Sequence, residues 1–190
     1  MSKHSKHTNQ VRIIGGNCRG RKIRFLSAES LRPTADMVRE RLFNWLGQDL
    51  TGLKVLDLFA GSGALGFEAA SRNAKQVVMV EKYRDTSKLL QQNKRELGLE
   101  DKITISVQDA LNYLKSSSEK FDVIFLDPPY AWEDWKTLFD QLEKCLSENA
   151  MIYIESASMP KIPEWLHLFR EGKSGKSLFE VRIYKPKIEK

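Results

Sequence analysis

The chain has 190 residues, 41% of them hydrophobic and 29% charged, which is typical of one ordinary globular domain with at most a small appendage. No apolar run approaches the roughly 20 residues that a membrane-spanning helix needs. The polar residues 1–10 lack the hydrophobic segment of a secretory signal, so we expect a cytoplasmic protein. Two distant cysteines and three scattered histidines form no zinc-type motif, which argues against a metal site.

Positive charge is concentrated at the N-terminal end. Residues 1–41 hold ten Lys and Arg against three acids, a charge of +7, and the rest of the chain carries −1 of the total of +6. A localised basic segment is typical of a surface that binds a polyanion. We interpret residues 1–10 as a disordered polar tail. Residues 11–50 are interpreted as a folded extension, because their charges alternate with apolar residues.

The basic extension is predicted to contain a β-hairpin and one helix. Residues 11–16 and 21–26 alternate polar and apolar side chains on either side of a stretch rich in Gly and Asn, which is typical of a hairpin. A helix is expected after Thr34, with Arg39 and Arg41 off its apolar face. We predict that this extension contacts nucleic acid; a simple accessory hairpin is the alternative. The side chains predicted to make the contact are Arg12, Arg19, Arg21, Lys22, Arg24, Arg32 and Arg39.

From residue 51 onwards, strands alternate with helices. This pattern predicts an α/β domain over residues 51–190, with a doubly wound and mostly parallel seven-stranded sheet. The parallel strands are expected over residues 54–59, 76–80, 102–107, 121–126 and 150–154, and the helices over 64–72, 84–98, 111–115 and 133–146. Two further strands, near residues 166–170 and 178–184, are predicted to form an antiparallel hairpin at the sheet edge, around a loop at 172–175.

A glycine-rich loop follows the first strand of this domain. Gly61, Gly63 and Gly66 form a GxGxxG pattern, in which glycines let a ligand approach the backbone at the start of a helix. The pattern alone is weakly specific, because nicotinamide cofactors are bound by the same arrangement. A nicotinamide enzyme therefore remains an alternative at this point.

Acids end three successive strands, at Asp57, Glu81 and Asp109. Ligands of open α/β sheets bind beyond the carboxyl ends of the strands. There Asp57 would repel a pyrophosphate but tolerate a cation, Glu81 could bind both ribose hydroxyls, and Asp109 could accept from an adenine amine. This arrangement fits S-adenosylmethionine, a nucleoside with positive charge and no phosphate. The alternative is that each acid caps a helix.

The strand at residues 121–126 runs into Asp127, Pro128, Pro129 and Tyr130. Two consecutive prolines have no backbone N–H groups, so this segment offers only hydrogen-bond acceptors, and an aromatic ring stands beside them. Rigid acceptors next to a stacking ring suit a planar base that carries an exocyclic amine. A plain turn is the alternative interpretation.

These motifs resemble known families. Residues 55–63, Glu81 and residues 126–130 resemble the class I S-adenosylmethionine-dependent methyltransferases that modify exocyclic amines. The parts that resemble the bacterial RsmD family in particular are residues 12–16, 19–23 and 31–34, then Asp36, residues 38–40 and residues 42–45. That family methylates N2 of a guanine in 16S ribosomal RNA. The resemblance spans about residues 11–184, nearly the whole chain.

The resemblance implies a Rossmann-like fold, S-adenosylmethionine as methyl donor, S-adenosylhomocysteine as product and no metal. It implies 16S ribosomal RNA as partner, free or within an assembling small subunit, and we expect a monomer. The cofactor would be held by Asp57, Phe59, Ala60, Gly61, Ser62, Gly63, Glu81, Lys82, Asp109 and Ala110. The target base would be held by Asp127, Pro128, Pro129 and Tyr130. A DNA adenine-N6 methyltransferase and a non-catalytic RNA-binding protein on the same scaffold stay open as alternatives.

Overall fold

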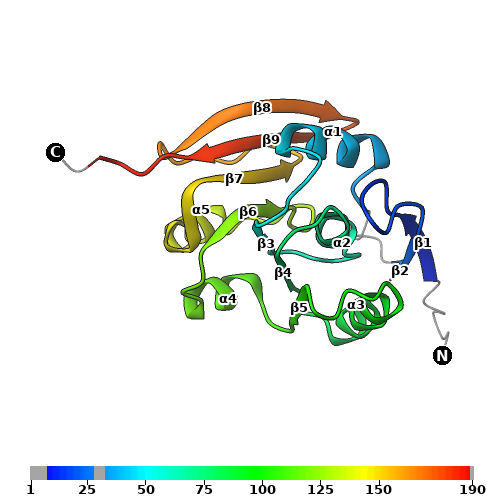
Figure 1. Ribbon diagram of the computed structural model, residues 1–190. Helices are drawn as coiled ribbons and strands as arrows, with labels where there is room; N and C mark the ends of the chain where they lie inside the picture. Colours follow the sequence, from blue (N-terminus) through cyan, green and yellow to red (C-terminus); the bar gives the residue numbers. More distant parts are fainter. Residues whose placement is uncertain (1–7, 28–32, 189–190) are drawn as a thin grey trace.

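A seven-stranded sheet organises the computed structural model, which describes residues 8–27 and 33–188 (Figure 1). The strands are β3 (Lys54–Asp57), β4 (Gln76–Val80), β5 (Ile103–Ser106), β6 (Phe121–Leu126), β7 (Leu146–Ser156), β8 (Leu166–Ser174) and β9 (Ser177–Tyr184). They lie in the order β5-β4-β3-β6-β7-β9-β8, and β9 is antiparallel to both of its neighbours. The predicted sheet with an antiparallel edge hairpin is confirmed. Its loop is shorter than expected, because β8 continues to Ser174.

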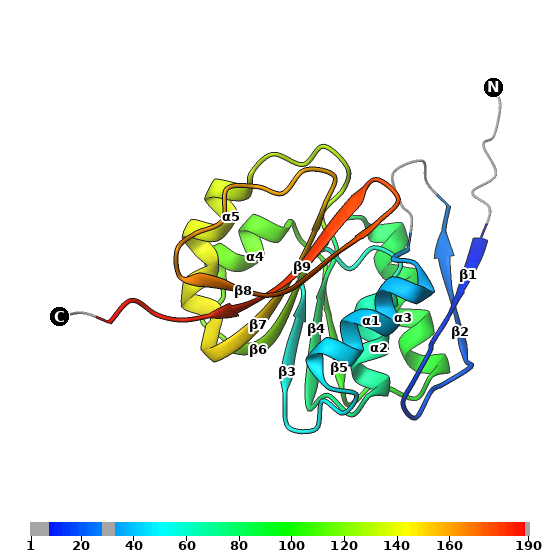
Figure 2. The same cartoon turned by 90° about the horizontal axis from the view of Figure 1, so that it is seen from above.

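Helices cover both faces of the sheet, which explains why its parallel strands are apolar at nearly every position. On one face lie α1 (Asp36–Leu46), α2 (Ala64–Ser71) and α3 (Arg84–Glu96). On the other lie α4 (Ala110–Ser116), α5 (Trp135–Leu142) and a short 3-10 helix, Glu143–Cys145 (Figure 2). None of the helices in the described residues is long and apolar enough to cross a membrane.

The strand order reverses at β3. Strands β4 and β5 lie to one side of it, and β6 and β7 lie to the other. All five strands are parallel, so their carboxyl ends meet at one edge of the sheet. The reversal point at this edge is where an open α/β sheet binds its ligand.

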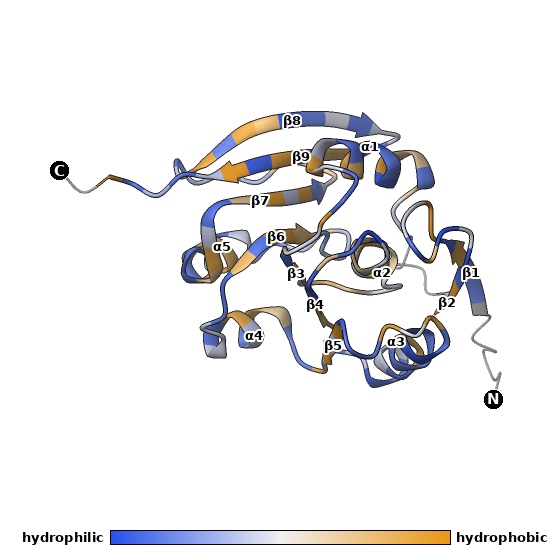
Figure 3. Cartoon of the chain, viewed as in Figure 1, coloured by the Kyte–Doolittle hydropathy of each residue, from blue (hydrophilic) through white to orange (hydrophobic). Residues whose placement is uncertain are grey.

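The predicted N-terminal hairpin is present as a separate two-stranded sheet, β1 (Thr8–Arg12) and β2 (Lys22–Leu26). It packs outside α3, which is hydrophilic over most of its length (Figure 3). Asn93 of α3 fastens the hairpin, because its side-chain amide donates to the Arg24 carbonyl (2.7 Å) and its oxygen accepts from the Arg24 N–H (3.1 Å).

The expectation of a disordered tail over residues 1–10 is wrong for its last three residues. Thr8, Asn9 and Gln10 are part of β1, because their backbone pairs in antiparallel register with Leu26, Phe25 and Arg24. A polar sequence does not prevent this pairing, since the strand hydrogen bonds use only main-chain groups. Residues 1–7 lie outside the described part of the chain.

Candidate active site

The glycine loop joins β3 to α2 at the carboxyl edge of the sheet. Gly63 directly precedes α2 with a φ of 82°, in the left-handed region that favours glycine. A Cβ at this position would lie 2.5 Å from the Phe67 ring, so the backbone and the packing both require glycine. Gly61 donates its N–H to Glu81 Oε2 at 3.0 Å, which ties the loop to the end of β4. The other Glu81 oxygen accepts from the Tyr83 N–H at 2.9 Å.

Asp57 is a buried acid directly before this loop. Its Oδ2 accepts from the Gly66 N–H at 3.0 Å. Burial raises the pKa of Asp57 to about 7; the Gly66 hydrogen bond lowers it, and the nearby Glu81 carboxylate raises it. No ion pair among the described residues includes Asp57 or Glu81. A buried carboxylate in these surroundings fits a ligand that brings its own positive charge.

The remaining predicted cofactor residues surround the same edge but differ in their contacts. Asp109 caps α4, since its Oδ1 accepts from the N–H groups of Leu111 (2.9 Å) and Asn112 (3.3 Å). The helix-cap alternative therefore applies to this acid, which is exposed. Ala110 is buried, whereas Lys82 is exposed beside Tyr83. The other predicted members are the loop residues Phe59, Ala60 and Ser62, of which Ala60 and Ser62 are buried.

Asp127 stands at the end of β6, directly after the strand that neighbours β3. Its Oδ2 accepts from the Thr34 hydroxyl at 3.2 Å. Loss of solvation raises the pKa of the Asp127 carboxyl well above its ordinary value, and the Glu155 and Asp57 carboxylates add to this, against the lowering effect of Thr34. The two motifs found in the sequence, the glycine loop and the Asp-Pro-Pro-Tyr segment, thus lie at adjacent strand ends.

The Asp-Pro-Pro-Tyr segment leads from half-buried Asp127 and Pro128 into a turn with an exposed ring at Tyr130. The Trp132 N–H closes the turn by donating to the Pro129 carbonyl at 3.1 Å. Within the described residues, no hydrogen bond uses the Pro128 carbonyl. The Tyr130 side chain is not packed into the protein, since the residue is 81% exposed. Trp132 instead packs edge-to-face on Phe59 of the glycine loop, with ring centroids 5.2 Å apart.

The prediction that Arg39 contacts nucleic acid is wrong. Arg39 has no exposed surface. Its guanidinium donates to the Thr34 carbonyl (3.2 Å), Glu68 Oε2 (3.2 Å) and Asp36 Oδ1 (2.6 Å). Helical periodicity placed Arg39 off the apolar face, but Glu68 of α2 gives it a buried partner that the local sequence does not reveal.

The other predicted basic residues divide into two groups. Arg24 pairs with Glu96 of α3 at 2.5 Å, and Arg21 donates to the Glu96 carbonyl at 2.8 Å. In contrast, three basic residues are exposed and form no ion pair within the described part of the chain. They are Arg12, Arg19 and Lys22. Arg32 lies outside the described residues.

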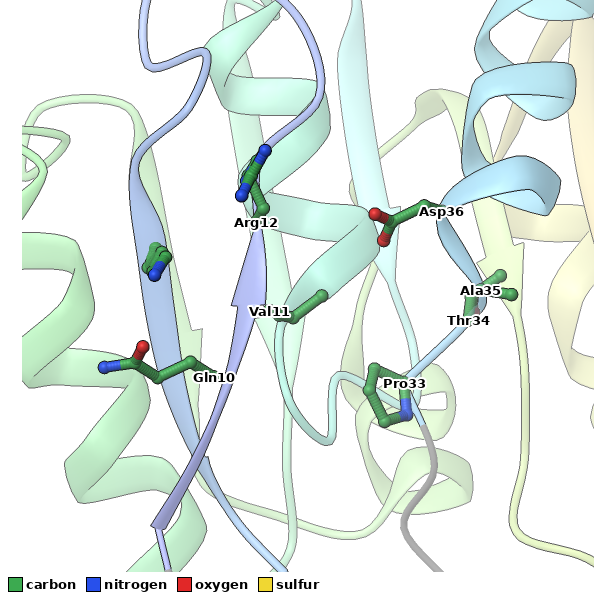
Figure 4. Close-up of a pocket in the computed structure, with 8 residues that line it drawn as sticks. Gln10, Val11, Arg12, Pro33, Thr34, Ala35 and Asp36 are labelled. Atoms are coloured by element: carbon green, nitrogen blue, oxygen red, sulfur yellow. The ribbon is translucent and has the colours of Figure 1, made fainter.

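An open pocket of about 570 Å³ separates the hairpin from the segment that leads into α1. Figure 4 shows Gln10 and Arg12 of β1 on one side and residues 33–36 on the other. Lys22 lines the hairpin side as the register partner of Arg12. Thr34, on the opposite wall, also donates to Asp127. The basic pocket and the Asp127 turn are therefore connected through one residue.

Three residues around Asp127 had no predicted role, namely Thr34, Tyr153 and Glu155. The Tyr153 hydroxyl donates to Glu155 Oε2 at 2.6 Å, and Thr34 donates to Asp127. Glu155 could have been found from the sequence, because it directly follows the strand predicted at residues 150–154. The rule that selected Asp57 at a strand end selects Glu155 as well.

No group of three His, Cys, Asp or Glu side chains in the described residues is arranged to hold a metal ion. The chemistry available at this edge is that of carboxylates, backbone amides and an aromatic ring. The donor set fits a cationic nucleoside: a buried acid, a second acid that accepts from the glycine loop, and a left-handed turn before a helix.

Comparison with known proteins defines the class of fold to which this chain belongs. A solved RNA methyltransferase from Salinibacter ruber, in complex with S-adenosyl-L-homocysteine, has the same fold, with 19% identity and a TM-score of 0.65 over 83% of this chain and 97% of that chain. The solved structure of yhhF from Escherichia coli is 35% identical, with a TM-score of 0.84 over 94% of this chain and 100% of that chain. The fold is that of the class I S-adenosylmethionine-dependent methyltransferases, and S-adenosylmethionine is the cofactor.

The family follows from a match that covers most of the sequence. The model of the family described as conserved hypothetical protein 95 matches residues 11–184, and the chain belongs to this family. A relative in Haemophilus influenzae, named ribosomal RNA small subunit methyltransferase D, is 40% identical over 182 residues, which cover 92% of this chain and 93% of the relative. The predicted membership of the RsmD family is confirmed.

Proposed function

We propose that this protein transfers a methyl group from S-adenosylmethionine to the N2 amine of a guanine in 16S ribosomal RNA. The observation that carries the proposal is the turn at the end of β6, where the Asp127 carboxylate stands beside the 81% exposed Tyr130. The name of the Haemophilus influenzae relative supports small-subunit ribosomal RNA as substrate. The choice of guanine N2 rests on the resemblance to the RsmD family. A ribosomal RNA substrate implies a cytoplasmic location.

The glycine loop and the acids around it would hold the cofactor. Asp57 would face its positive charge, Glu81 its ribose, and the loop backbone at Gly61 and Gly63 would allow close approach. When bound, the cofactor supplies an electrophilic methyl group on a sulfonium sulfur. Phe59, Ala60, Ser62, Lys82, Asp109 and Ala110 would complete the pocket.

The Asp-Pro-Pro-Tyr turn would activate the amine. The amine lone pair of guanine is delocalised into the ring, which makes the nitrogen a poor nucleophile. The Asp127 carboxylate and the Pro128 carbonyl would accept hydrogen bonds from the two N–H groups of the amine. These bonds would favour a pyramidal nitrogen as positive charge develops on it. Acceptors held rigidly in advance stabilise the transition state more than the ground state. Tyr130 would stack on the base, which must leave its own stack to reach this turn.

The exposed hairpin cations would hold the RNA backbone next to the turn. We expect the double substitution Arg12→Gln and Lys22→Gln to weaken RNA binding. The plot of log affinity against log salt should become shallower by roughly 1 to 2, because binding releases fewer counterions when phosphate contacts are lost. Filter binding or fluorescence anisotropy at several salt concentrations measures the slope.

A matched control removes the same charge elsewhere. Lys115 on α4 and Lys120 directly before β6 are both exposed, and α4 lies on the opposite face of the sheet from the hairpin (Figure 2). Their double substitution by Gln should leave the salt slope unchanged. If the control lowers the slope as much as the hairpin variant does, net charge explains the effect and the hairpin is not part of the interface.

The function is tested by incubating the protein with labelled S-adenosylmethionine and either unmodified 16S ribosomal RNA or small-subunit particles. We expect label on N2 of one guanine, mapped by nuclease digestion and mass spectrometry. Label on adenine N6 of added DNA would instead support the DNA methyltransferase alternative. RNA binding without any transfer would support the non-catalytic alternative.

A further inference from the structure

The Asp127 carboxylate has one hydrogen-bond donor among the described residues. This donor is the Thr34 hydroxyl, whose Oγ1 lies 3.2 Å from Asp127 Oδ2. No ion pair in the same part of the chain includes Asp127. The orientation of this carboxylate therefore depends on a single contact with the N-terminal extension.

Thr34 is itself held in place from the side of α2. It is buried, and its carbonyl accepts from Arg39 Nε at 3.2 Å. The Arg39 guanidinium also donates to Glu68 Oε2 (3.2 Å) and Asp36 Oδ1 (2.6 Å). A guanidinium is planar and rigid, so its two bonds to carboxylates fix the direction in which the Nε–H group points. The position of residue 34 is therefore set by Glu68, a fully buried residue of α2.

The same helix fixes the cofactor side of the site. Helix α2 begins directly after the glycine loop, and its Gly66 N–H donates to Asp57 Oδ2 at 3.0 Å. Glu68 lies two positions further along this helix. One helix is thus bonded to Asp57 directly and to Thr34 through Arg39, so both halves of the site share one rigid element.

Methyl transfer depends on such a shared reference, because donor and acceptor must be aligned and a misplacement of about 1 Å can cost about 100-fold in rate. We propose that Thr34 is a positioning residue for methyl transfer, whose hydroxyl holds the Asp127 carboxylate in place relative to the cofactor loop. The N-terminal extension is then part of the active site as well as a surface for RNA. This role rests on the proposed function, in which Asp127 accepts from the amine.

Two substitutions of Thr34 test the proposal. Thr34→Val removes the hydroxyl but keeps a branched side chain of similar size, whereas Thr34→Ser keeps the hydroxyl. We expect Thr34→Val to lose roughly 10- to 100-fold in kcat, with unchanged KM for RNA and unchanged affinity for S-adenosylmethionine. Thr34→Ser should retain most of the activity. Full activity in Thr34→Val, equal losses in the two folded variants, or a loss confined to KM would each overturn the proposal.

Thr51 offers a matched control. Its hydroxyl donates to Asp49 Oδ1 at 2.6 Å, ahead of β3 and therefore at the opposite edge of the sheet from the site. Thr51→Val removes the same kind of hydrogen bond and should leave kcat unchanged. A comparable loss of kcat in this control would mean that any lost contact of this kind slows the protein, and would overturn the special role of Thr34.

A double-mutant cycle tests whether Thr34 acts through Asp127. In the Asp127→Ala background the hydroxyl has no partner carboxylate, so adding Thr34→Val should cause no further loss in the single-turnover rate. Additive losses would mean that Thr34 acts elsewhere, and would overturn the proposal.

A measurement without substrate distinguishes this inference from the proposed function. Burial raises the pKa of Asp127, as do the Glu155 and Asp57 carboxylates, whereas the hydrogen bond from Thr34 lowers it because it favours the ionised form. Carboxyl ¹³C NMR should show a signal, absent in Asp127→Ala, whose titration midpoint moves to higher pH in Thr34→Val but not in Thr34→Ser. An unmoved midpoint overturns the inference even if guanine is methylated. A moved midpoint in a protein that methylates no RNA would support the contact and refute only the function.

Discussion

Replacing Asp127 by Ala is expected to reduce methyl transfer by roughly 10³-fold, the upper end of the cost of removing one preorganised polar contact to a developing charge. The substitution removes the acceptor at the end of β6 that Thr34 holds at 3.2 Å. The glycine loop, Asp57 and Glu81 do not depend on this side chain for their hydrogen bonds. Affinity for S-adenosylmethionine should therefore remain close to that of the unaltered protein. Single-turnover methylation and calorimetric titration of the cofactor measure the two quantities.

Two further variants sharpen this result. Asp127→Asn keeps an acceptor oxygen and should retain more activity than Asp127→Ala. Asp140→Ala, an exposed acid on α5, should change neither quantity. Normal turnover combined with lost cofactor affinity in Asp127→Ala would contradict the role given to the turn.

Replacing Glu68 by Ala is expected to lower the free energy of unfolding by about 3–5 kcal/mol, the usual cost of breaking a buried ion pair by removing one partner. Glu68 is fully buried in α2. Its carboxylate accepts from Arg72 (2.9 Å), Arg39 (3.2 Å) and the N–H groups of Ile14 (3.0 Å) and Gly15 (2.8 Å). The variant leaves two buried guanidinium groups and two backbone donors without this partner. Urea unfolding with a constant m-value measures the change.

The matched control is Glu96→Ala on α3, which breaks an exposed ion pair with Arg24. That variant should lose less than about 1 kcal/mol, because water and salt screen exposed pairs. Equal losses in the two variants would mean that Glu68 does not fasten the N-terminal segment to the methyltransferase domain. Hydrogen exchange at Ile14 and Gly15 should accelerate in the Glu68 variant only.

Features that depend on neighbours in the sequence were predictable. The alternation of strands and helices follows from local hydrophobic periodicity, so the doubly wound sheet and its edge hairpin were anticipated. Motifs such as the glycine loop and the Asp-Pro-Pro-Tyr turn consist of consecutive residues, whose backbone requirements can be read locally. The position of these motifs at adjacent strand ends then follows from the parallel topology.

Residues whose surroundings come from distant segments were not predictable in the same way. Arg39 has the sequence signature of an exposed helical cation, yet it is buried and paired with Glu68 of another helix. Asp109 satisfies the strand-end rule but also caps the following helix, and both interpretations were open. Arg21 and Arg24 are tied to Glu96 across more than 70 positions of the chain.

The sequence by itself determined the class of fold, the family and the two motifs on which the proposed chemistry depends. The reason is that local hydrophobic periodicity and short runs of consecutive residues are enough to recognise them. Only the tertiary structure decided which charges are available at the surface and which acids share one site. Thr34 and Asp127 lie 93 positions apart and meet at one hydrogen bond. Packing of the N-terminal segment on the sheet brings them together, since side chains this far apart in sequence become neighbours only when the hydrophobic faces between them are buried.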